Sequence, residues 1–165
     1  MINKSKIIFT IFFTFFCFFS NFLSASEIFN FDVKEVEIKE NGNKFIGKKG
    51  GVAKSIDGTI IKAENFNYNK DKNILIASDK VQIYDPKNNI KIYSDKVTYL
   101  KNLEIIFTDG NSRAIDDEVQ IDAKDFEYNK RKNQILATGN VKINNKRDNY
   151  LIYSDKVTYL KNLEI

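Results

Sequence analysis

The stretch IKAENFNYNKDKNILIASDKVQI, residues 61–83, recurs 60 positions later as IDAKDFEYNKRKNQILATGNVKI, residues 121–143. Apolar and polar residues alternate with period two in both copies, which is typical of β-strands with one buried face. Polar clusters separate these runs and suit tight turns. They lie at residues 69–73, 85–89, 129–133 and 144–145 and at the pairs Asp109-Gly110 and Gly139-Asn140. The repeat therefore predicts an all-β fold of antiparallel hairpins.

An extra residue breaks the alternation at equivalent places in the two copies, between Ala63 and Phe66 and between Ala123 and Phe126. A bulge or bend at these places would return the apolar residues to the same face of the strand. Strands that kink at regular places can curl one sheet over another. We therefore expect repeated kinked hairpins to form an antiparallel flattened roll or sandwich with an apolar interior. Residues 36–43 alternate more weakly and predict a degenerate first hairpin.

The N-terminus has the pattern of a secretory signal peptide. Lys4 and Lys6 precede an apolar run over residues 7–23, which ends in small residues that include Ala25 and Ser26. The run has 17 residues, whereas a membrane-spanning helix needs about 20. We therefore favour cleavage after Ala25 or Ser26 over an uncleaved membrane anchor.

This assignment divides the chain into a signal peptide, residues 1–25, and one exported domain, residues 26–165. The only cysteine, Cys17, lies in the signal, so the exported domain must fold by burial and hydrogen bonding without disulfides. The periplasm of a Gram-negative bacterium is the expected location.

The composition leaves little material for catalysis or for nucleic-acid binding. The chain has no histidine, which excludes Ser–His, Cys–His and His-ligated zinc chemistry in this polypeptide. The acidic stretch 116–118 lacks the spacing of a calcium loop. The 23 lysines against 3 arginines are expected from an AT-rich genome rather than from a nucleic-acid partner. We expect no enzyme activity, no catalytic residues, no cofactor and no metal site.

Units of the form Ile-x-Ala-x-x-Phe-x-Tyr-Asn followed by Leu-x-Ala-x-Gly-x-Val-x-Ile resemble the OstA-like (organic solvent tolerance) family. The best match joins Ile121–Asn129 to Ile135–Ile143, and residues 61–83 match with Ser-Asp in place of Thr-Gly. The resemblance covers about residues 58–165. This family contains the periplasmic bridge protein of lipopolysaccharide transport and the N-terminal domain of the outer-membrane lipopolysaccharide-assembly protein.

The resemblance implies an open β-jellyroll that shelters the acyl chains of lipopolysaccharide in an apolar groove. It implies two kinds of partner: lipopolysaccharide, and other jellyroll domains of the transport machinery that dock through strand edges, with self-association as a further option. The location is the periplasm, with attachment to the outer membrane if the chain is the N-terminal part of a longer barrel protein. The candidate groove residues are Ile61, Ala63, Phe66, Leu75, Ala77, Val81, Ile83, Ile121, Ala123, Phe126, Ile135, Ala137, Val141 and Ile143.

Alternative interpretations stay open for three features: the apolar stripe, the repeated tyrosines and the basic turn. An inward apolar stripe is also what an ordinary packed core requires, so the alternative function is a structural or adhesive exported β-repeat protein without lipid cargo. Tyr68, Tyr99, Tyr128 and Tyr159 occupy equivalent positions, where they either line the opening of a groove or mark the margin of a core. The basic turn at residues 129–133 could contact lipid phosphates or simply be solvated.

Identity between the two copies changes abruptly along the repeat. It is 12 of 31 over residues 61–91 and 14 of 14 over residues 92–105. A recent local duplication or a gene record broken at a repeated stretch would each produce this pattern. The first copy continues into residues 106–110, which complete a hairpin, whereas the second ends at Ile165. We therefore expect the exported domain to be truncated at its C-terminus.

Overall fold

The computed structural model describes residues 28–161, so the predicted signal peptide lies outside the described residues. This part of the chain forms twelve β-strands, and every strand pair is antiparallel. The strands are β1 (Phe29–Lys39), β2 (Lys44–Ser55), β3 (Ile60–Ala63), β4 (Asn65–Asn69), β5 (Ile74–Asp85), β6 (Ile90–Leu100), β7 (Ile105–Asp109), β8 (Ser112–Ile115), β9 (Val119–Ala123), β10 (Asp125–Asn129), β11 (Gln134–Asn145) and β12 (Tyr150–Leu160). A short 3-10 turn, η1 (Glu40–Gly42), joins β1 to β2 and closes the predicted first hairpin.

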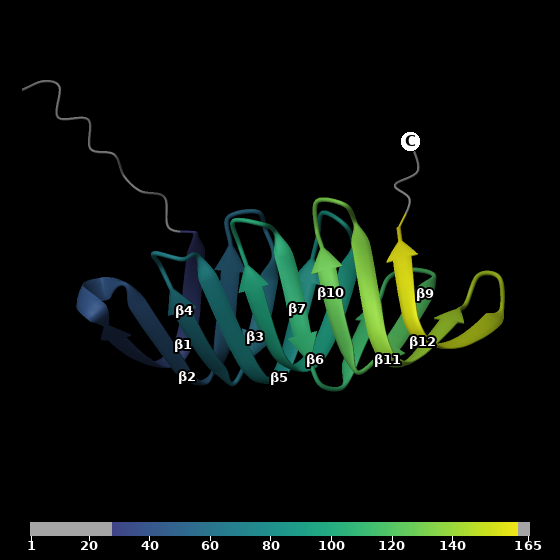
Figure 1. The fold of residues 1–165 in the computed structure, drawn as a ribbon. Coiled ribbons are helices and arrows are strands. Elements are labelled where there is room, and N and C mark those ends of the chain that lie inside the picture. The colour runs from purple at the N-terminus through teal and green to yellow at the C-terminus, as the bar shows by residue number, and fades with distance from the viewer. Residues whose placement is uncertain (1–27, 162–165) are drawn as a thin grey trace, which may run out of the picture.

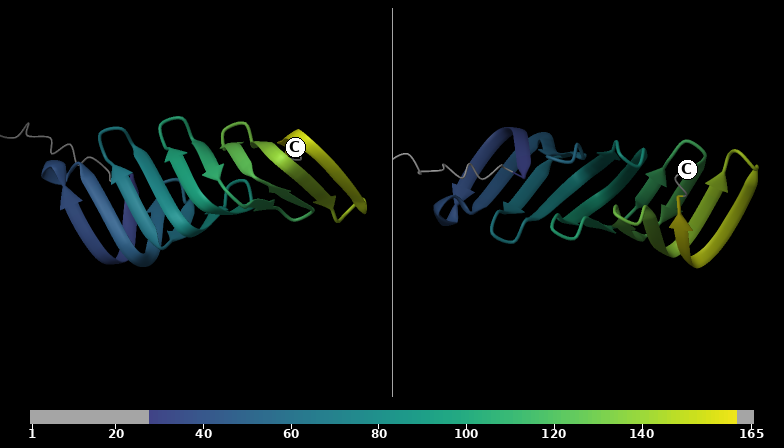
Figure 2. Two further views of the ribbon diagram at one scale, coloured as in Figure 1. Left: turned by 60° about the horizontal axis from the view of Figure 1, so that its bottom comes forward. Right: turned by 90° about the horizontal axis from the view of Figure 1, so that it is seen from above.

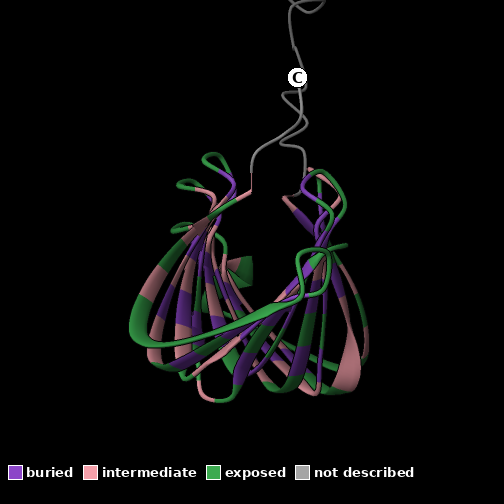
Figure 3. Ribbon diagram, turned by 90° about the vertical axis from the view of Figure 1, so that its right-hand side faces the viewer, coloured by how far each residue is buried: buried purple, intermediate pink, exposed green. Residues whose placement is uncertain are grey.

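The long strands pass from one layer of the fold to the other. One half of β5 pairs with β4 and the other half with β3, and β11 divides in the same way between β10 and β9. The first layer therefore follows the order β1-β2-β4-β5-β6-β7-β10-β11-β12, and the second the order β1-β2-β3-β5-β6-β8-β9-β11-β12. Figure 1 and Figure 2 show how the chain advances along the long axis from β1 to β12. Seen along that axis, the layers are the two walls of a trough (Figure 3).

Bends in the strands lie where the alternation is interrupted. The backbone bends at Glu64 between β3 and β4, and at Lys124 between β9 and β10, which confirms the predicted kinks. Strand β11 pairs with both β9 and β10, and it passes the bend at Lys124 with a register shift of its own. The shift lies at Gly139 and Asn140, where φ is +80° and +50°. A Cβ atom on Gly139 would lie 2.9 Å from the Cβ atom of Lys124, so only glycine fits this crossing without a shift.

Two of the predicted tight turns are such bends instead. The Gly139-Asn140 pair lies inside β11, and the Asp109-Gly110 pair lies where β7 leads into β8. Both β7 and β8 pair with β6, so the chain keeps its direction while it changes layer. Left-handed residues here bend the strand rather than reverse it, and the prediction of hairpins at these two pairs was wrong.

The core lies between the two layers, where their inward faces meet. Buried strand residues alternate with exposed ones, as in the pattern BeBeBeeB that opens β6. Burying each large aliphatic or aromatic side chain contributes about 1.5–3 kcal/mol. Within residues 28–161 no helix is long and apolar enough to cross a membrane.

Candidate functional site

The predicted groove residues come together on the inward faces of the two layers. Thirteen of the fourteen belong to one buried core cluster, and Ala123 packs against that cluster half-buried. The cavity near Ile90, Ile121 and Ile135 measures only about 10 Å³, so side chains fill the interior there. The structure thus brings the predicted residues together in one apolar strip, in a closely packed conformation.

The interior opens at its N-terminal end, where none of the fourteen candidate groove residues lies but where Tyr68 was predicted to line a groove opening or a core margin. A cavity of about 300 Å³ lies there, with Phe29, Phe31, Phe45 and Tyr68 among its lining. The rings of Phe31 and Phe45 stack with centroids 4.1 Å apart, and those of Phe29 and Tyr68 meet edge to face at 5.1 Å. The alternation in Phe29-Asn-Phe31 was the available signal, but these residues lie before the clear repeats.

Three equivalent tyrosines bridge the two layers along the open side of the trough. The Tyr99 hydroxyl donates to Asp57 Oδ2 at 3.2 Å, and the Tyr128 hydroxyl donates to Asp85 Oδ2 at 2.7 Å. The third bond has the same form: the Tyr159 hydroxyl donates to Asp116 Oδ2 at 2.7 Å. In each pair the tyrosine ends a strand of the first layer and the aspartate lies in or beside a turn of the second. We call these three bonds the tyrosine–aspartate clasp.

Lysines reinforce the clasp from the first layer. The Nζ atom of Lys130 lies 2.7 Å from Asp57 Oδ2 and 3.8 Å from Asp85 Oδ2, and it also bonds the Thr59 hydroxyl. Lys101 Nζ lies 2.8 Å from the same Asp57 oxygen. Lys130 is only 6% exposed, so this member of the basic turn is neither solvated nor available to a lipid phosphate in this conformation.

The clasp perturbs the titration of its members. Burial acts to raise the pKa of Asp57, but the hydrogen bonds from Lys101 and Lys130 outweigh it and hold that pKa well below its usual range. Burial, together with the adjacent carboxylates, raises the pKa of Tyr99 and of Tyr128 above the usual value. The clasp is therefore a network of neutral tyrosines and paired charges near neutral pH.

The last strand exposes residues that an identical sequence buries elsewhere. Residues 152–160 of β12 repeat residues 92–100 of β6, yet Ile92 is 0% exposed and Ile152 is 42% exposed. Strand β6 has β5 on one side and β7 with β8 on the other, whereas β12 pairs only with β11 within the described residues. The outer edge of β12 is therefore an apolar, unpaired strand edge.

Two antiparallel layers joined by bent strands around an elongated apolar interior define an open β-jellyroll. Residues 120–164 match the family described as LptA/(LptD N-terminal domain) LPS transport protein, which confirms the resemblance found in the repeats. The fold is similar to the crystal structure of LptH, the LptA homologous periplasmic component of the conserved lipopolysaccharide transport device from Pseudomonas aeruginosa. The TM-score is 0.61 at 11% sequence identity, over 67% of this chain and 82% of that one. A comparison with curated proteins finds no significant match.

Proposed function

We propose that this chain is a periplasmic carrier of lipopolysaccharide that shelters acyl chains between its two layers and performs no chemistry of its own. The observation that carries the proposal is the strip of inward apolar side chains between the two layers of a jellyroll, which is elongated along the axis from β1 to β12 (Figure 1). The match of residues 120–164 to lipopolysaccharide-transport proteins supports it. Each acyl methylene that leaves water for such a strip contributes about 0.8 kcal/mol.

Loading an acyl chain requires the packed layers to separate. The bent strands join the layers covalently along one side of the trough, whereas side-chain bonds of the clasp join them along the other. Separation is therefore easiest on the clasp side. The cavity lined by Phe29, Phe31, Phe45 and Tyr68 is a starting point that is already open. Small residues such as Ala77 and Ala137 on the inner faces would leave room once the layers part.

The free strand edges support docking to related jellyrolls. Strands β1 and β12 stand at the two ends of both layers, and each pairs on one side only in residues 28–161. A strand from another jellyroll could add to either edge through main-chain hydrogen bonds and cover exposed apolar residues such as Ile38 and Ile152. We propose that such docking extends the apolar interior from one domain into the next.

One observation favours the alternative of a structural β-repeat protein. The interior near Ile121 and Ile135 is filled by its own side chains, as in a protein whose core never receives a ligand. The two functions differ in whether lipid ever reaches these inward positions.

Site-specific photo-crosslinking distinguishes the two functions. A photoreactive amino acid at Phe126 or Val141, each at most 2% exposed, should capture purified lipopolysaccharide, and the same group at the exposed Phe107 should not. Circular dichroism must show that each variant retains the β-fold. Absence of capture at every inward position in folded protein would refute the carrier and leave the structural protein.

A further inference from the structure

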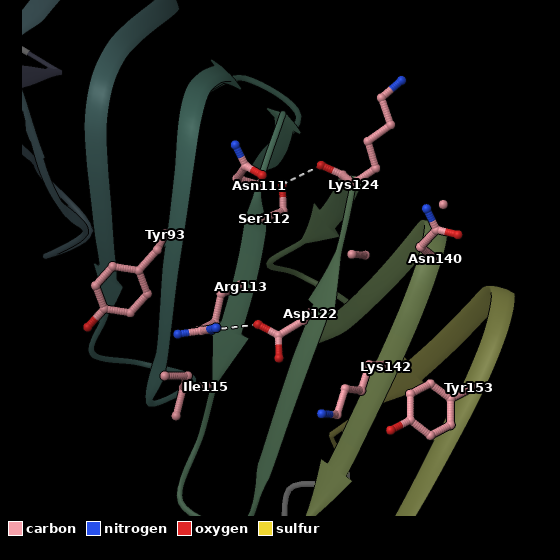
Figure 4. A pocket seen from close by; sticks show the side chains of 12 residues that line it. Tyr93, Asn111, Ser112, Arg113, Ile115, Asp122, Lys124, Asn140, Lys142 and Tyr153 are labelled. Carbon is pink, nitrogen blue, oxygen red and sulfur yellow. Dashed lines mark hydrogen bonds and ion pairs between the residues drawn. The ribbon is translucent and has the colours of Figure 1, made fainter.

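The outer face of the second layer carries an open groove of about 1140 Å³ (Figure 4). Its exposed side chains alternate along the strands with buried ones, so the groove lies on the opposite side of the sheet from the apolar interior. Its lining includes Tyr93, Arg113, Asp122, Lys142 and Tyr153. These residues come from β6, β8, β9, β11 and β12, five neighbouring strands of one layer. The proposed carrier function uses none of them.

The strand register places these five side chains in one row across the sheet. Tyr93 pairs with Arg113, Arg113 with Asp122, Asp122 with Lys142, and Lys142 with Tyr153. Strands lie about 4.8 Å apart, so the row spans about 19 Å from one tyrosine to the other. The two tyrosines are related by the 60-residue repeat, and Figure 4 shows one at each side of the groove with the charged residues between them.

The row combines flat aromatic faces with polar side chains. Tyr93 is 36% exposed and Tyr153 is 70% exposed, so both rings offer apolar area to a ligand while their hydroxyls stay in water. Between the tyrosines, Arg113 Nε lies 2.5 Å from Asp122 Oδ1, and Gln120 Nε2 donates to Asp122 Oδ2 at 2.8 Å. This alternation of ring faces and planar polar groups suits a ligand that is itself apolar on its faces and polar at its edges, as a sugar ring is.

The charges of the groove favour an anionic ligand. Its lining holds three cations, Arg113, Lys124 and Lys142, against the single carboxylate of Asp122. The Nζ atom of Lys142 lies 5.8 Å from the centroid of the Tyr153 ring, and that of Lys124 lies 3.7 Å from Asp125 Oδ2 in an exposed ion pair. Exposed pairs contribute about 0–1 kcal/mol, so a phosphate can compete for these cations.

We propose that this groove binds a short phosphorylated oligosaccharide, namely the glycan part of the lipopolysaccharide that the interior is proposed to carry. The choice of lipopolysaccharide as the source rests on the proposed function, whereas the ligand chemistry rests on the row itself. A glycan cannot follow acyl chains into the interior, because burying its hydroxyls without partners would cost several kcal/mol for each group. An outer polar groove gives the same molecule a second, separate contact.

Calorimetric titration of the folded exported domain with delipidated, phosphorylated lipopolysaccharide oligosaccharide tests the proposal. We expect saturable binding that weakens at high ionic strength, and a loss of affinity of about tenfold for each of the variants Tyr93→Ala and Tyr153→Ala. Phe107→Ala is the matched control, because Phe107 is 38% exposed on β7 of the other layer and should leave the affinity unchanged.

The other outcomes separate the groove from the carrier function. Equal binding by Tyr93→Ala, Tyr153→Ala and wild type, or no binding at all, would overturn the groove proposal. Inorganic phosphate that binds as tightly as the oligosaccharide would overturn it too, because the site would then be a simple anion site. Lipid capture at Phe126 without glycan binding would support the carrier function and refute the glycan-binding groove. Glycan binding without lipid capture would support the groove and refute the carrier function.

Discussion

Replacing Tyr128 by phenylalanine tests whether the clasp holds the two layers together. The ring is fully buried and would stay in place, so the substitution removes only the hydroxyl. That hydroxyl donates to Asp85 Oδ2 at 2.7 Å and accepts from Asn88 Nδ2 at 2.8 Å. Asp85 would keep the Asn88 amide at 3.0 Å and the Lys87 backbone amide at 3.1 Å, so the carboxylate would lose one donor without becoming isolated.

The expected cost follows from the charge and burial of Asp85, which is 0% exposed. A hydrogen bond to a charged group contributes about 1.5–3 kcal/mol, so Tyr128→Phe should lower the free energy of unfolding by about 2 kcal/mol. For a domain of this size that is a fall in Tm of about 8 °C. Urea unfolding followed by circular dichroism measures the change. Tyr153→Phe, which removes a hydroxyl at a 70% exposed position, should stay within about 0.5 kcal/mol of wild type.

The same variant links the clasp to the proposed carrier function. If the layers must part on the clasp side for lipid to enter, Tyr128→Phe should increase photo-capture of lipopolysaccharide at Phe126 while it lowers stability. A variant as stable as Tyr153→Phe would refute the energetic role assigned to the clasp. A variant that is destabilised but captures no more lipid would refute the idea that the clasp controls entry.

Three further predictions follow from the bends, the charges and the repeated strand. Because the pKa of Asp57 is lowered in the folded state, the unfolded state binds the proton more readily. The free energy of unfolding should therefore fall as the pH drops through about 4 and below. Urea unfolding at a series of pH values measures this fall, which should be smaller for Asp57→Asn. Gly139→Ala should lower the Tm more than Gly42→Ala does, as thermal melts of the two variants would show. Both glycines have positive φ, but a Cβ atom would lie 2.9 Å from Lys124 at Gly139 and would have no neighbour within 4 Å at Gly42. Ile92→Lys should prevent folding, whereas Ile152→Lys should fold and, in sedimentation experiments, weaken any association through β12.

Sequence periodicity was sufficient to predict the strands, the kinks and the inward residues. Those features depend on which side chains face the core, and Phe66 and Phe126 mark that face in both copies. The clasp was not predicted, because its partners lie 42 or 43 positions apart in different layers. A signal existed, since an aspartate precedes each of Tyr99, Tyr128 and Tyr159 by nearly the same interval. The outer row was not predicted either, because it depends on cross-strand register rather than on spacing along the chain.

The identical segments of β6 and β12 show that local sequence determines strand formation, whereas neighbouring strands determine burial. Both segments form strands with the same inward residues, because alternation and propensity are local properties. Their burial differs because β6 has strands on both sides, whereas β12 has one. A strand added to the outer edge of β12 should therefore lower the exposed fraction of Ile152 toward that of Ile92. Such an added strand would take the place beside β12 that β7 and β8 take beside β6.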